Sequence, residues 1–116
     1  MSISSDEEEF NFRYYFSLNE DGSVTPVEVR EWAKWYENAD RSIAKYAFDK
    51  YDLSAVFLGI NHNYGEGPPL IFEMMIFKKG TYDEVFCERF STKSETLLRA
   101  QELVHLIESG KMKLDD

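Results

Sequence analysis

"DLSAVFLGINHNYGEGPPLIFEMMIF", residues 52–77, places two almost continuous apolar runs on either side of a loop rich in glycine and proline. Runs of this length and composition are typical of central strands that are covered on both faces of a sheet. Asn63 and the glycines permit left-handed backbone, while Pro68 and Pro69 hold the returning chain extended. This stretch therefore predicts a β-hairpin at the centre of the fold, closed by a loop longer than a simple turn needs.

The flanking segments extend the sheet. Residues 10–18 alternate strictly between apolar and polar side chains, which predicts a half-buried strand. Residues 43–50 and 85–90 alternate in the same way and predict two more strands. Turn residues at 19–22 are followed by Ser23 and Val24, which can return beside the first strand.

Two helices are indicated by their starting residues. Thr25, followed by proline and by Glu28, has the pattern of a capping box, and Thr92 with Glu95 repeats it. Gly110 is well placed to end the second helix. From the helical spacing we expect one core on one sheet face, built from Trp32 and Tyr36 of the first helix and Leu97, Val104 and Ile107 of the second.

These elements predict an α+β fold in the order β-α-β-β-β-β-α. The expected sheet is an antiparallel meander of about five strands with two helices on one face. We expect residues 1–9 to be a disordered acidic tail, residues 10–110 a single domain, and residues 111–116 a short C-terminal tail.

Composition limits the function classes. The 116 residues carry a net charge of −9, which argues against direct nucleic-acid binding but leaves open an acidic surface that imitates a nucleic-acid backbone. The alternative is an ordinary solvated acidic surface. A single cysteine, no signal-peptide pattern and only short apolar runs predict a cytoplasmic protein without membrane contact.

Catalytic and metal-binding patterns are weak. His62 and His105 are the two histidines, and Cys87 has the setting of a small buried hydrophobe instead of a reactive thiol. A metal would need His62 with Glu66, with or without Glu73, and the spacing of the first two on a loop implies no fixed geometry. We therefore predict no metal, no cofactor and no enzymatic activity.

The loop remains the best candidate for a binding site. His62, Asn63, Tyr64, Gly65 and Glu66 form the candidate set, and the alternative is an inert hairpin end. Glu73, in a strand otherwise apolar, needs a partner, for which Arg89 and Lys45 are both placed.

The central stretch resembles a motif in a family of small, uncharacterised bacteriophage and prophage proteins. In that family a strand ending like FLGLDH leads through a G-x-G-P-P loop into a strand like LLFETMVF. The segment "TPVEVREWAKWYENADRSIAK" is similar to the family's helix, and "ERFSTKSE" to its R-Y-S-T-W-x-E, with Lys93 in place of the tryptophan. The resemblance covers about residues 12–105 and implies a phage or prophage origin without implying an activity.

By analogy with small acidic phage proteins, we expect this chain to bind and modulate a host protein that handles nucleic acid or serves in defence. One alternative is a small-molecule-binding or hydrolytic domain that uses residues 62–66. Another is a minor virion component.

The last expectation concerns assembly. If both helices lie on one sheet face, the other keeps apolar side chains, with interface candidates Ile71, Glu73, Met75 and Phe77. A second copy is the simplest cover, which predicts a homodimer with the 62–67 loops at its rim. Alternatively the host target covers this face and the free protein is a monomer.

Overall fold

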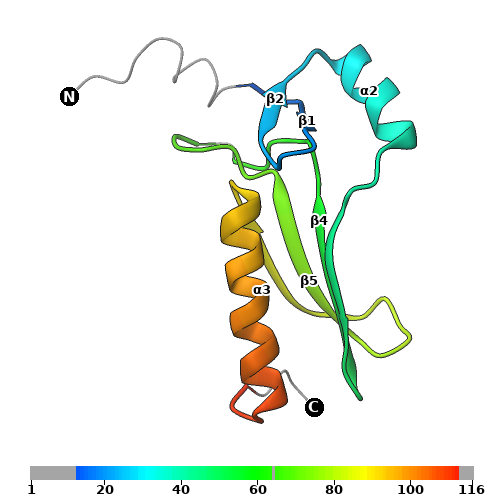
Figure 1. Cartoon of the computed structure of the whole chain (residues 1–116), viewed down its shortest axis with the longest axis vertical. Coiled ribbons are helices and arrows are strands. Elements are labelled where there is room, and N and C mark those ends of the chain that lie inside the picture. Colours follow the sequence, from blue (N-terminus) through cyan, green and yellow to red (C-terminus); the bar gives the residue numbers. More distant parts are fainter. Residues whose placement is uncertain (1–12, 64, 113–116) are drawn as a thin grey trace, which may run out of the picture.

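The computed structural model describes residues 13–63 and 65–112, so the predicted N-terminal tail lies outside the described residues. Within these residues, two helices and two antiparallel sheets make an α+β fold, as predicted (Figure 1). The elements are β1 (Phe16–Leu18), β2 (Val24–Pro26), α2 (Val29–Asn38), β3 (Ser42–Ala47), β4 (Tyr51–Phe57), β5 (Phe72–Lys78), β6 (Glu84–Phe90) and α3 (Lys93–Glu108).

The main sheet has four strands in the order β3-β4-β5-β6, each antiparallel to its neighbour. The prediction of one five-stranded sheet is wrong, because β1 pairs with β2 in a separate sheet. The two sheets meet where Tyr15 forms a bridge with Ile60 and the Phe16 N–H donates to the Gly59 carbonyl at 2.8 Å. Both contacts use the loop after β4, so the first strand joins that loop instead of the sheet edge.

Helix α3 packs along the main sheet, against β3, β5 and β6 (Figure 1). Its start is the predicted one: the Thr92 side chain accepts a hydrogen bond from the Glu95 N–H at 3.1 Å. Its buried residues are Thr96, Ala100 and Leu103, whereas Leu97, Val104 and Ile107, which we expected in the core, are only partly buried. Ala100 and Leu103 pack with Leu53, Ala55, Met74 and Ile76 in the larger core cluster, which Ile107 flanks.

Helix α2 does not lie beside α3, and the prediction of two helices on one face is wrong. It contacts β1 at the end of the sheet, and none of its ten residues, all within the described part of the chain, is buried (Figure 1). It also begins later than predicted, after Glu28, because Thr25 and Pro26 pair with β1. Proline is tolerated there because β2 is an edge strand that needs no donor at that position.

A second, smaller core joins the β1–β2 sheet to the main sheet. Phe16 and Phe57 are fully buried in it together with Ile71 and Phe72. Trp35 of α2 meets the Phe57 ring edge-on at 5.5 Å between centroids. Trp35 is thus the α2 residue that reaches this core, whereas Trp32 and Tyr36 were wrongly expected to pack on the sheet.

Candidate functional site

The loop between β4 and β5 is held by two asparagines. Asn61, only 4% exposed, accepts hydrogen bonds from the N–H groups of Asn63 at 2.8 Å and Leu70 at 3.2 Å. Its amide nitrogen donates to the Arg13 carbonyl at 3.1 Å, which ties the loop to the start of the described chain. Sequence analysis missed this residue, although an asparagine two positions before another in a glycine-rich loop is typical of such local bonding.

Asn63 uses its side chain inside the loop. Its amide nitrogen donates to the carbonyls of Glu66 at 3.2 Å and Pro68 at 2.9 Å, and its oxygen accepts from the Gly65 N–H at 3.0 Å. These three bonds satisfy backbone groups that the irregular chain would otherwise leave unpaired. Asn63, one of the predicted site residues, therefore shapes the loop and has little capacity left for a ligand.

The other candidate residues of the loop are not brought together into a polar cluster. The His62 backbone N–H donates to the Leu70 carbonyl at 3.0 Å, and its side chain is half-buried. Gly65 and Glu66 are exposed, and Tyr64 lies outside the described residues. Within the described residues no hydrogen bond or ion pair joins the side chains of His62 and Glu66, and no group of three histidine, cysteine or acidic side chains could hold a metal.

The sheet face turned away from α3, here called the open face, carries a second group of candidates. The register places Ser54, Met75 and Cys87 side by side across three strands. Val56, Glu73 and Arg89 form the next row, and Asp52 lies opposite Phe77. Ile71, predicted to share this face, precedes β5 and is buried in the smaller core.

Glu73 and Arg89 form the ion pair that the sequence suggested as one of two possibilities. The Arg89 Nε lies 3.0 Å from the Glu73 Oε2, and the glutamate side chain is only 12% exposed. A carboxylate so far removed from water needs this partner, because an unpaired buried charge is strongly destabilising. The pair places a neutralised polar patch in the middle of the open face.

Cys87 lies next to this pair and is half-buried. Burial, reinforced by the negative charges of Glu73 and Glu84, raises the pKa of its thiol to about 11. The thiol is therefore protonated near neutral pH, which opposes a nucleophilic role.

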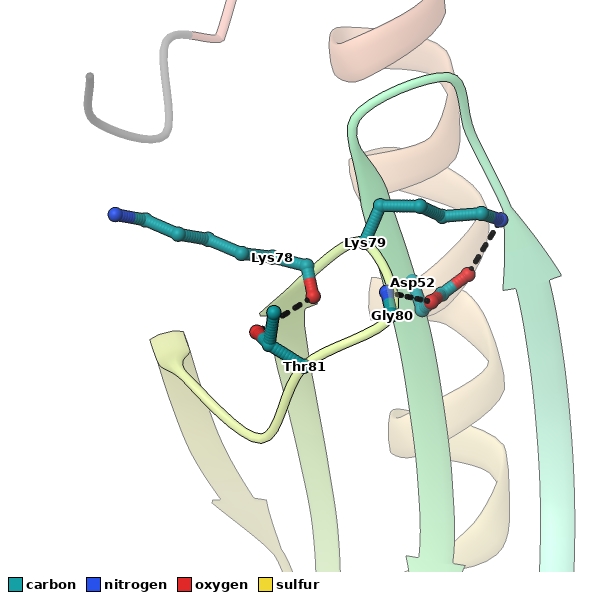
Figure 2. Close-up of polar contacts among 5 residues, drawn as sticks. All are labelled: Asp52, Lys78, Lys79, Gly80 and Thr81. Carbon is teal, nitrogen blue, oxygen red and sulfur yellow. Dashed lines mark hydrogen bonds and ion pairs between the residues drawn. The ribbon is translucent and has the colours of Figure 1, made fainter.

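The turn between β5 and β6 is fastened to β4 by one carboxylate. Figure 2 shows Lys79 and Gly80 directed at Asp52, whose oxygens accept from the Lys79 Nζ at 2.8 Å and the Gly80 N–H at 3.4 Å. The lysine hydrogen bond is the largest cause that holds the pKa of Asp52 below its ordinary value. The Thr81 hydroxyl donates to the Lys78 carbonyl at 2.9 Å in the same turn (Figure 2).

That fastened turn presents Tyr82, which is 97% exposed. Aromatic side chains are usually at least partly covered in a soluble domain, since exposing one forgoes a large apolar burial. No sequence signal distinguished Tyr82 from the other tyrosines, because its exposure depends on the position of the turn.

A row of aromatic rings lies between α2, the residue before β1 and the loop after β4. The Trp32 ring packs between Tyr15, at 5.3 Å, and Tyr36, at 4.5 Å between centroids, and the Arg41 guanidinium lies 4.0 Å above the Tyr36 ring. The Trp32 Nε1 is buried without a hydrogen-bond partner among the described residues. It faces Gly59, where an added Cβ would lie 2.4 Å away.

Comparisons with protein-family models, with curated proteins and with solved structures gave no match. Among the described residues, neither helix combines the length and the apolar content needed to cross a membrane.

Proposed function

We propose that this protein acts by binding other proteins and not by catalysing a reaction, and that the open face is its main contact surface. The observation that carries the proposal is the composition of that face. Val56, Met75 and Phe77 supply apolar area, while the Glu73–Arg89 pair supplies polar groups that are already neutralised. This mixture is typical of protein–protein contact surfaces, which are about as apolar as the remaining surface of a protein.

The proposed target is a host protein that handles nucleic acid or serves in defence, met in the bacterial cytoplasm. The resemblance to phage and prophage proteins supports this choice, as does the acidic balance of the chain. Residues 13–112 carry 12 basic and 16 acidic side chains, a net charge of −4 of the total −9. More than half of the negative charge thus lies in the terminal segments, which favours attraction of a basic partner over close imitation of a nucleic-acid backbone.

Affinity purification from the bacterial host tests the proposal. Met75→Lys places a charge in the open face, and Leu98→Lys makes the same change on the outside of α3, where Leu98 is 68% exposed. We expect the wild type and Leu98→Lys to retain the same host protein and Met75→Lys to lose it. Retention by Met75→Lys together with loss on the double change His62→Ala and Glu66→Ala would instead favour a loop-based binding or hydrolytic site.

We propose separately that the open face can pair with that of a second copy, because a second copy is the partner that is always present. The structure changes the predicted interface in two respects, the first being that Ile71 is buried in the smaller core and does not lie on this face. The open face is not a continuous apolar patch, since Ser54, Asp52 and the Glu73–Arg89 pair interrupt it. The apolar area is therefore smaller than the sequence suggested, and the strength of self-association has to be worked out from the dimensions of the face.

A further inference from the structure

We infer that the open face pairs with the open face of a second copy in a weak isologous dimer, which exchanges with the monomer in the micromolar range. This inference rests on the proposed function in one respect, namely that the open face is a protein-contact surface. The occupant is a second copy because charge and symmetry on this face suit self-pairing, while its area limits the strength of the association.

The charges of the open face are balanced, unlike those of the whole chain. The acidic side chains Asp52 and Glu73 are paired with Lys79 at 2.8 Å and Arg89 at 3.0 Å. Lys45, opposite Ser54 on β3, adds one positive charge at one edge of the face, and Glu84, opposite Phe77 on β6, adds one negative charge at the other. Two copies that each carry −9 overall therefore repel one another least when these faces meet, because charges elsewhere stay farther apart.

The area of the face sets the strength of the dimer. Strands β4, β5 and β6 each have seven residues, so at about 3.3 Å per residue they are about 23 Å long. Four strands spaced about 4.8 Å apart are about 19 Å wide, which gives a footprint of about 440 Å². A standard stable interface buries about 800 Å² per partner, so this face alone supports weak association.

Symmetry favours one arrangement. A twofold axis that lies between the sheets and runs across the strands through Met75 would place each Met75 over its counterpart. With this axis each strand lies over the same strand of the other copy and runs in the opposite direction. Arg89 of one copy then approaches the end of β6 that carries Glu84 in the other, so opposite charges lie close together. An axis along the strands would instead stack Glu73 on Glu73, which like-charge repulsion disfavours.

Sedimentation equilibrium of the full chain from about 5 μM to about 500 μM tests the inference. We expect the average mass of the wild type and of Leu98→Lys to rise above 13.6 kDa with concentration, and that of Met75→Lys to stay there. Added salt should strengthen the association, because it screens the repulsion between two acidic chains. A wild type that stays at 13.6 kDa throughout, or equal association of the two variants, would overturn the inference.

The thiol of Cys87 provides a second readout that needs no variant, in case Met75→Lys fails to fold. Cys87 lies on the open face beside Met75, so pairing should cover it. At about pH 9, its alkylation by iodoacetamide should slow by about twofold or more across the concentrations where the mass rises. An unchanged rate despite a rising mass would show that the copies meet elsewhere. A monomeric wild type that still retains a host protein would refute the dimer and leave the proposed function standing.

Discussion

Replacing Gly59 with alanine tests how the N-terminal unit, which consists of β1, β2 and α2, packs against the loop after β4. Gly59 has a φ of +74°, a left-handed conformation that disfavours any residue with a Cβ. In addition, the new Cβ would lie 2.4 Å from the Trp32 Nε1 and 2.9 Å from the Phe16 carbonyl oxygen. The carbonyl belongs to the backbone of β1, and Trp32 is held between two tyrosine rings, so neither can yield freely.

Gly80 is the matched control. Its φ is +72°, nearly the same as that of Gly59, but an added Cβ would meet nothing within 4 Å. A left-handed conformation destabilises the folded state of a non-glycine residue by roughly 1–2 kcal/mol. Alanine also lowers the conformational entropy of the unfolded chain, which stabilises the folded state by about 0.4–1 kcal/mol. Gly80→Ala should therefore lower the free energy of unfolding by about 1 kcal/mol. Gly59→Ala adds an overpacking cost of about 1–3 kcal/mol and should lose about 2–4 kcal/mol.

Urea denaturation followed by circular dichroism measures both free energies. For a domain of this size each kcal/mol also shifts the melting temperature by roughly 4–8 °C, so the two variants should be well separated. Trp32→Phe removes the Nε1 atom, and the double variant with Gly59→Ala should recover part of the loss. If Gly59→Ala and Gly80→Ala lower the free energy of unfolding by the same amount within about 0.5 kcal/mol, Trp32 does not pack against Gly59.

Three further changes probe the core, the fastened turn and the loop. Leu103→Asp should unfold the domain, because it buries an unpaired charge at a fully covered position. Leu98→Asp, on the exposed side of the same helix, should melt within a few degrees of the wild type. Comparable melting temperatures of the two variants would contradict the assignment of the buried face of α3. Because the folded pKa of Asp52 is lowered, its contribution to stability is present above its unfolded pKa and is lost as pH falls through the folded value. The urea midpoints of the wild type and Asp52→Asn should therefore begin to converge as pH falls below about 4, and a gap that does not narrow with falling pH would rule out the carboxylate–Lys79 bond as its source. Asn61→Ala should lower the free energy of unfolding by about 1–3 kcal/mol and should speed hydrogen exchange at the Asn63 and Leu70 amides, which donate to the Asn61 side chain. Unchanged exchange at these amides would show that other contacts hold the loop.

The four strands of the main sheet and α3 could be predicted because their signals are local. The apolar runs of β4 and β5 specify central strands without reference to the rest of the chain. Thr92 starts α3 through its own side chain, and Gly110, with a φ of +72°, follows the end of the helix as expected. The Glu73–Arg89 ion pair could be predicted for a related reason, because neighbouring strands joined by a short turn have few possible registers.

The errors arose where distant residues decided between two local possibilities. Thr25 and Pro26 suit a helix start and an edge strand equally, and pairing with β1 selected the strand. Thr96 takes a buried position on α3 because its hydroxyl donates to the Thr92 carbonyl at 2.8 Å, a bond that no hydrophobic pattern reveals. The roles of Asn61 and Tyr82 were missed because they depend on where the loops lie in space.

The dependence of the N-terminal unit on residues far along the chain has a consequence for synthesis on the ribosome. Phe16 emerges first, but Phe72, which shares its core cluster, is made 56 residues later. At roughly 5–20 residues per second, Phe16 of β1 waits about 3–11 s before Phe72 is made. During that interval Phe16 and both tryptophans are exposed on an incomplete chain, which makes this segment the one most in need of chaperone protection while the protein is made.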